Sequence, residues 1–353
     1  MAAKDEFDQG WNLYLRFNAT DNAAAIPHLK RAIELDPGYG RAYAALASVY
    51  FRAAEYLWFQ ELGMHWFEVL ARGDQYSQLA SKYPTALFHT VEAQGHTYYG
   101  RAEEAVREAG RAIASDPNDP EAHIAMAWAL TISGKPKDAL DFVGTAMRLN
   151  PNYPSHYVLA RGVALLAASD LEQAADVLDE GFKRNPAATA LLPPLASVLA
   201  QIGRRQEARQ ALQTWRPGTD PLMFANIWNS YTFPVRWKPE YASVRERLYD
   251  GLRVASLPLD VTVSSLLAEL KGKDPFVRQL AVQRLGWFGP EAAQTVPALI
   301  ELLGDEDVRT EAVRSLGKIG PSAREAVPAL DALKNESPIG FYAKIALREI
   351  RGF

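Results

Sequence analysis

The chain contains no cysteine, so it can form no disulfide, thiolate metal site or cysteine nucleophile. It also lacks an excess of either charge, because 38 Lys and Arg against 42 Asp and Glu leave a formal net charge of −4. A general nucleic-acid binder usually carries a basic excess. No apolar run reaches the ~20 residues of a membrane span, and the first residues, MAAKDEFDQGW, contain no signal-peptide core. We therefore expect a cytoplasmic protein, or a soluble fragment of a larger or membrane-anchored one, with no nucleic-acid partner and no membrane insertion.

Catalytic motifs are missing as well. The sequence contains no HExxH, no Walker-type GxxxxGK[ST], no GxSxG and no GxGxxG. The histidines are scattered without ligand spacing, at His28, His65, His89, His96, His123 and His156. The sequence thus predicts a non-enzymatic protein with no cofactor and no metal.

The chain does contain a recurrent proline. Pro84, Pro117, Pro151 and Pro186 are 33, 34 and 35 residues apart, and three of them follow an aspartate or asparagine at the same turn. A period near 34 residues is typical of a helix-turn-helix solenoid. Such a unit cannot bury its apolar face alone, so neighbouring units stack and leave a concave surface that can bind a partner.

The unit Pro120–Pro151 shows the repeat most clearly. Small residues such as Ala127 and Ala139 stand where two helices must approach closely, and larger ones such as Leu130 and Val143 supply the apolar filling. This pattern resembles the tetratricopeptide (TPR) repeat. The resemblance implies about six repeats over residues 5–216, the first and the last imperfect.

An insertion at 51–71 interrupts the second repeat. It is rich in aromatic residues, namely Tyr56, Trp58, Phe59, Trp66 and Phe67. Two interpretations stay open. The insertion packs back on the solenoid as core, or it forms an exposed patch for a partner, since Trp and Tyr are enriched at the centres of interfaces.

The 34-residue period vanishes between residues 217 and 259. We expect one helix here, Glu240–Val254, as part of a capping and linking segment that closes the apolar end of the first solenoid. The alternative is that Trp228, Tyr231 and Trp237 form a binding site of their own.

A second period, of 31 residues, begins after Pro258. Val277-Arg278 recurs as Val308-Arg309, and Gly289-Pro290 recurs as Gly320-Pro321. The pattern resembles short bacterial HEAT-type repeats and implies three helix pairs over 260–353. In such turns an aspartate caps the second helix and the arginine ties neighbouring repeats together. The sequence therefore predicts an all-α protein of two fused right-handed α-solenoids.

Three further segments suggest a wider relationship. Trp11–Arg16, Ala32–Pro37 and Gly251–Pro258 resemble the TPR tail of bacterial class III adenylate and guanylate cyclases. The cyclase domain and its metal-binding aspartates are absent from this sequence. The resemblance implies a regulatory or sensory module of a signalling enzyme.

We predict a protein–protein interaction scaffold that binds a peptide or protein in its concave groove, with the regulatory module as the alternative. Arg41, Arg52 and Trp128 are expected to face one concave surface, where arginines would hold an acidic or C-terminal carboxylate. In the other interpretation, Trp128 fills a gap between helices and the arginines are merely solvated. The full set of candidate partner-binding residues is Arg41, Ser48, Arg52, Trp128, Thr131, Trp58 and Trp66.

Overall fold

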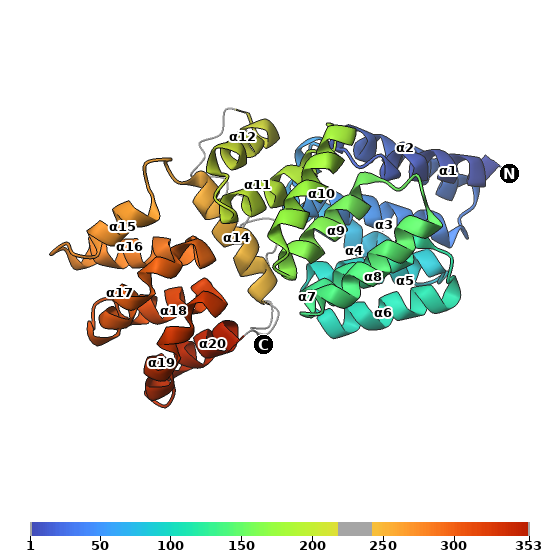
Figure 1. The fold of residues 1–353 in the computed structure, drawn as a ribbon. Helices are drawn as coiled ribbons and strands as arrows, with labels where there is room; N and C mark the ends of the chain where they lie inside the picture. The colour runs from blue at the N-terminus through green and yellow to red at the C-terminus, as the bar shows by residue number, and fades with distance from the viewer. Residues whose placement is uncertain (1, 218–241, 352–353) are drawn as a thin grey trace. The chain divides into compact units, whose positions relative to one another are not determined.

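The computed structural model describes residues 2–217 and 242–351, and every regular element in these ranges is helical. Figure 1 shows the helices stacked as antiparallel pairs. The predicted all-α solenoid fold is therefore confirmed. Trp228, Tyr231 and Trp237 lie outside the described residues, as does the start of the predicted helix Glu240–Val254.

The TPR-like part consists of alternating inner and outer helices. Each odd-numbered helix from α1 to α9 packs against the even-numbered helix that follows it, and α3, α5, α7 and α9 lie side by side. The elements are α1 (Ala2–Leu15), α2 (Ala19–Leu35), α3 (Gly40–Glu55), η1 (Trp58–Gln60), α4 (Trp66–Ala80), α5 (Ala86–Tyr98), α6 (Ala102–Ser115), α7 (Pro120–Ile132), α8 (Pro136–Leu149), α9 (Ser155–Ala167), α10 (Leu171–Arg184), η2 (Thr189–Leu191), α11 (Leu192–Gln201) and α12 (Arg205–Trp215).

The recurrent proline ends the second helix of a repeat. Asp36 and Asp116 leave the helical conformation, with φ of −143° and −147°, and their backbone N–H groups still bond to the last turn of α2 and α6. Each carboxylate then accepts the N–H two residues on, at 3.0 Å from Gly38 and 3.1 Å from Asn118. Because the intervening proline has no N–H and cannot continue a helix, the chain turns there.

The HEAT-like part follows α14 (Ala242–Ser256). The first helices of the pairs, α15, α17 and α19, are short, and 3₁₀ turns precede α17 and α19, whereas α16, α18 and α20 are regular and pack in sequence. The elements are α15 (Val263–Glu269), α16 (Pro275–Trp287), η4 (Gly289–Thr295), α17 (Val296–Glu301), η5 (Leu302–Gly304), α18 (Arg309–Ile319), η6 (Gly320–Ala326), α19 (Val327–Leu333) and α20 (Ile339–Arg351).

Arginines at the repeat turns join successive HEAT-like pairs, as predicted. The Arg278 guanidinium donates to Asp305 at 3.0 Å, and Arg309 donates to Glu336 at 3.0 Å. The expected aspartate cap is absent from α18, because this helix begins only at Arg309 and its N-cap residue, Val308, makes no side-chain cap; Asp305 instead accepts the Asp307 N–H at 3.0 Å. An aspartate does cap α16, where Asp274 accepts the Phe276 N–H at 2.9 Å.

The described residues divide into two compact units. One holds residues 2–195 with the start of α14 up to Arg247, and the other holds residues 196–217 and the chain from Leu248 onward. In the second unit, the Arg205 guanidinium of α12 donates to the carbonyls of Pro258 and Val261, at 2.7 and 2.6 Å. The division into 5–216, 217–259 and 260–353 follows the repeat periods and stays a prediction.

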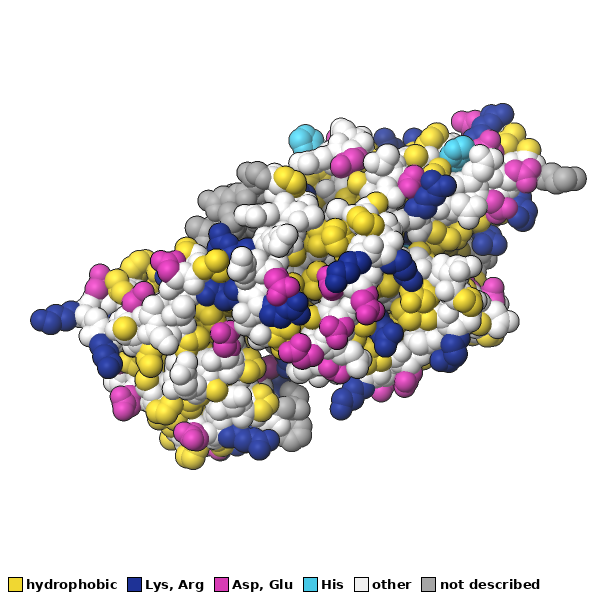
Figure 2. Space-filling model, turned by 45° about the horizontal axis from the view of Figure 1, so that its top comes forward, with side chains coloured by type: hydrophobic (Ala, Val, Ile, Leu, Met, Phe, Trp, Pro, Cys, Tyr) yellow, Lys and Arg dark blue, Asp and Glu magenta, His cyan; other side chains and the backbone are white. Residues whose placement is uncertain are grey.

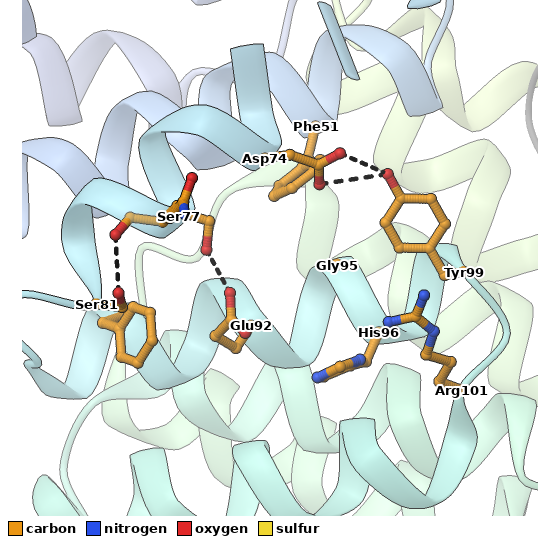
Figure 3. Close-up of a pocket in the computed structure, with 11 residues that line it drawn as sticks. Phe51, Asp74, Ser77, Ser81, Glu92, Gly95, His96, Tyr99 and Arg101 are labelled. Carbon is orange, nitrogen blue, oxygen red and sulfur yellow. Dashed lines mark hydrogen bonds between the residues drawn. The ribbon is translucent and has the colours of Figure 1, made fainter. Parts of the chain in front are cut away.

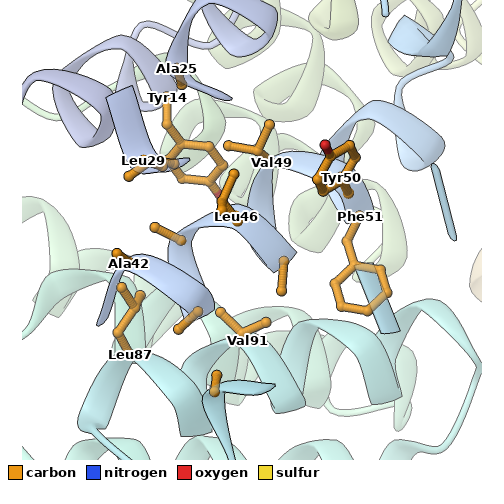
Figure 4. Close-up of a cluster of buried hydrophobic side chains, with 14 of the residues drawn as sticks. Tyr14, Ala25, Leu29, Ala42, Leu46, Val49, Tyr50, Phe51, Leu87 and Val91 are labelled. Atoms are coloured by element: carbon orange, nitrogen blue, oxygen red, sulfur yellow. The ribbon is translucent and has the colours of Figure 1, made fainter. Parts of the chain in front are cut away.

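The core of the first unit is built from small and large residues in alternation. Tyr14, Leu29, Leu46 and Val91 fill the space between helices in Figure 4, while alanines such as Ala25 let the helices approach. Close interdigitation of this kind is what repeat-to-repeat stacking requires, because each helix pair exposes an apolar face on its own.

Candidate functional site

A buried arginine lies on the inner side of the first unit. Arg52 is 5% exposed, and its guanidinium donates to the Tyr14 carbonyl at 2.9 Å. The guanidinium carbon lies 3.5 Å from the centroid of the Tyr14 ring and 5.1 Å from that of Phe17. Arg52 thus makes both a hydrogen bond and cation–π contacts within the chain.

A buried carboxylate lies near this arginine. Glu121 accepts hydrogen bonds from His156 Nε2 at 3.0 Å and from the Tyr157 hydroxyl at 2.8 Å. Burial acts to raise the pKa of Glu121, but His156 and Arg52 outweigh it and hold that pKa below its usual value. Burial, together with the charge of Arg52, lowers the pKa of His156.

The start of the insertion fills the space beside this cluster. Leu57, with φ of 62°, turns the chain so that Tyr56 and Trp58 both pack against Phe17, with ring centroids 5.1 and 5.5 Å away. Phe17 in turn lies 5.6 Å from the His156 ring. Trp58 is 6% exposed, whereas Phe67, further along the insertion, is 65% exposed. The first part of the insertion is core and Phe67 is surface.

The predicted partner-binding residues do not form one accessible surface. Ser48, Arg52 and Trp128 line the same small cavity, of about 40 Å³, and Trp58 reaches the neighbouring aromatic cluster. Arg41 is elsewhere, exposed, with its guanidinium 4.9 Å from the Phe7 ring. Thr131 is buried and bonds to the Ala127 carbonyl of its own helix, and Trp66 begins α4, half-buried.

Glu55 borders the same small cavity, and burial raises its pKa to about 7 from an ordinary 4.5. Between pH 4.5 and about 7 the unfolded chain loses the Glu55 proton while the folded state keeps it, so stability falls across this window and levels off above it. Glu55→Gln should therefore stabilise the protein at pH 8 by about 2 kcal/mol more than at pH 5. Urea unfolding at both pH values measures this, with Glu61→Gln, an exposed position, as the control. Equal effects at the two pH values would contradict it.

A larger cleft opens between α4 and α5. Its volume is about 310 Å³, and both helices contribute polar side chains to it. Phe51 of α3 separates the two helices: a Cβ on Gly73 would lie 2.7 Å from its ring, and one on Gly95 would lie 3.7 Å away. The two glycines let the phenyl ring enter between the helices, and α4 consequently packs only loosely on α5.

The walls of this cleft carry two carboxylates (Figure 3). Asp74 of α4 accepts the Tyr99 hydroxyl at 3.2 Å, and Glu92 of α5 accepts the Ser77 hydroxyl. Burial raises the pKa of Asp74, with a contribution from the charge of Glu92. Arg101 lies at the edge of the cleft, 5.3 Å from the Tyr99 ring. The sequence analysis missed this site, whose only signal is the glycine pair at Gly73 and Gly95.

Within residues 2–217 and 242–351, no three or more His, Asp or Glu side chains lie together so that they could hold a metal ion. No helix in the same ranges is long and apolar enough to cross a membrane. On the face seen in Figure 2, acidic and basic side chains of the described residues are interspersed rather than gathered by sign.

Comparisons with known families find both repeats. Residues 263–348 match the model of HEAT repeats, and residues 159–221 match a model of the tetratricopeptide repeat. No curated protein matches the chain. Neither family match concerns a nucleotide cyclase, so the similarity to a cyclase tail stays a hypothesis.

Three solved structures are similar to the chain. The first, titled "Functional Characterization of Pseudomonas Aeruginosa pilF", is 18% identical with a TM-score of 0.36, covering 63% of this chain and 94% of the other. A human IFIT1 dimer with m7Gppp-AAAA is 14% identical with a TM-score of 0.40, covering 94% and 85%. The P58(IPK) TPR domain is 12% identical with a TM-score of 0.28, covering 100% and 98%. Likeness at this level says nothing about what the chain binds.

The chain is thus an all-helical repeat protein in which residues 159–221 match tetratricopeptide repeats and residues 263–348 match HEAT repeats. Repeats of these families are typically non-enzymatic and suggest a protein-interaction scaffold, because stacked helix pairs present extended binding surfaces.

Proposed function

We propose that the protein is a scaffold that binds a polypeptide, and that the partner enters the cleft between α4 and α5. The observation that supports this most directly is the cleft itself, which at about 310 Å³ lies at the lower end of the range of ligand-binding pockets. That volume admits one or two side chains of a partner.

The lining of the cleft has the mixture that recognition requires. Phe51 and Phe88 supply apolar contact area, and Asp74, Glu92 and Tyr99 supply polar groups that can orient a ligand. The inner side of the first unit is less suitable for binding a partner, since Arg52 and Glu121 already form hydrogen bonds within the chain.

Site-specific photo-cross-linking tests this proposal on the full chain. p-Benzoylphenylalanine replaces Gln78 at the cleft, Trp128 on the inner side, or the exposed Gln173 of α10 as the control. A random dodecamer peptide library is displayed, bound and irradiated. We expect peptides to be captured through position 78 at least about tenfold more than through position 173, which corresponds to about 1.4 kcal/mol of preference.

The other outcomes discriminate between the alternatives. Capture through position 128 alone would place the partner in the groove predicted around Arg41, Arg52 and Trp128, and the cleft would be excluded. Equal capture at all three positions, or none above background, would contradict a peptide-binding scaffold.

A further inference from the structure

We propose that the α4–α5 cleft recognises a basic residue, so that the partner places an arginine or lysine side chain between Asp74 and Glu92. This inference rests on the proposed function and adds the chemistry of the partner. The two carboxylates come from different helices and line the same cavity of about 310 Å³. An arginine side chain is long enough to place its charged end there while the backbone of the partner stays outside.

The carboxylates keep acceptor capacity for such a guest. Asp74 accepts the Tyr99 hydroxyl, and Glu92 accepts the Ser77 hydroxyl. A carboxylate has about four lone-pair positions, so each can accept further hydrogen bonds from a guanidinium or an ammonium group. The hydrogen bonds from Tyr99 and Ser77 already hold the two carboxylates in place. Binding of the guest therefore costs less side-chain conformational entropy.

The charge of the cleft also favours a cation. Asp74 and Glu92 outnumber the single guanidinium of Arg101, which is exposed and lies 5.3 Å from the Tyr99 ring, and His96 completes the titratable groups of the lining. Among the described residues, no ion pair of 4 Å or less joins Arg101 to either carboxylate. Burial raises the pKa of Asp74, and the charge of Glu92 raises it further, so a positive charge between the two carboxylates would stabilise their ionised forms.

The aromatic residues match the rest of a basic side chain. Phe51 and Phe88 line the cleft beside the carboxylates. A lysine or arginine can lay its methylene groups on such rings while its charged end reaches the acids, and a guanidinium can stack on an aromatic face. A purely apolar guest would desolvate both carboxylates further without bringing a positive charge to either, which costs free energy.

The test compares three proteins with the same peptide library. They are the wild-type chain, the double variant Asp74→Asn with Glu92→Gln, and a matched control, Asp141→Asn with Glu180→Gln, which removes two exposed charges from α8 and α10. We expect peptides selected on the wild type and on the control to be enriched in arginine or lysine, and peptides selected on Asp74→Asn with Glu92→Gln to lose that enrichment.

A second measurement isolates the charge. In the tightest peptide, citrulline replaces arginine (or norleucine replaces lysine), and binding is measured by calorimetry. We expect this replacement to weaken binding at least about tenfold on the wild type and less than about threefold on the double variant. Thermal unfolding checks that the double variant is folded; if it is not, Asp74→Asn alone, at an exposed position, takes its place.

The results separate this inference from the proposed function. Peptides that cross-link through position 78 without basic enrichment, or that lose no affinity with citrulline, would overturn the inference and leave the scaffold proposal standing. If no peptide is enriched on the wild type, the scaffold proposal fails and this inference fails with it.

Discussion

Arg52→Ala should lower the free energy of unfolding by about 3–5 kcal/mol, the range for breaking a buried charge interaction from one side. The side chain is 5% exposed and donates to the Tyr14 carbonyl. Its removal leaves that carbonyl without its donor and takes a positive charge away from the buried Glu121, whose low pKa depends partly on it. The Tyr14 and Phe17 rings also lose the guanidinium that lies on them.

Arg41→Ala is the matched control for this effect. Arg41 belongs to the same helix and also contacts an aromatic ring, that of Phe7 at 4.9 Å, but it is exposed. Its replacement should cost less than about 1 kcal/mol. Chemical denaturation of both variants at pH 7 gives the comparison. If Arg52→Ala were as stable as Arg41→Ala, the buried contacts described for Arg52 would contribute little to the free energy of unfolding. That result would favour the prediction that Arg52 binds a partner.

Gly251→Ala should destabilise the second unit by about 1–3 kcal/mol or more, because α14 meets α11 at this position without room for a side chain. A Cβ on Gly251 would overlap the hydroxyl and the carbonyl oxygen of Ser197. The same serine hydroxyl donates to the Leu248 carbonyl at 2.9 Å, so the two helices cannot separate without losing this bond.

Gly110→Ala in α6 serves as the control, because the nearest atom to its Cβ would be the flexible end of Met126, at 3.9 Å. Alanine at a helix interior with free space is favoured over glycine by about 0.5–1 kcal/mol. The two substitutions should therefore shift the melting temperature in opposite directions in a calorimetric scan. A gain of stability in both would mean that α14 and α11 are not in close contact.

The repeats could be predicted from the sequence because their determinants are local. The Asp-Pro turns at Asp36 and Asp116 end a helix through contacts within a few residues, and the small residues of a helix pair recur because each pair repeats the same close approach. The Arg278 and Arg309 contacts were likewise predictable, since they join one repeat to the next at a constant offset. Periodic sequence features of this kind predict contacts within one repeat or between adjacent repeats, but not contacts between distant ones.

The aromatic insertion at 51–71 could not be placed from the sequence in this way. Its aromatic composition allowed a core or an exposed patch, and nothing local distinguishes Trp58 from Phe67. The difference arises because Phe17, some forty residues earlier, packs against both Tyr56 and Trp58, and Phe17 in turn lies against His156, about a hundred residues later. A contact between residues so far apart leaves no trace in a repeat period.

By itself, the sequence determined the helical class, the two repeat types and the turns between helices, since these depend on residues within one or two repeats. Only the tertiary structure decided which polar residues are accessible. Arg52, predicted to face a partner, is bonded to Tyr14, whereas Asp74 and Glu92 face an open cleft. The physical reason is that exposure depends on how helices stack, and here one phenyl ring, Phe51 between Gly73 and Gly95, separates α4 from α5.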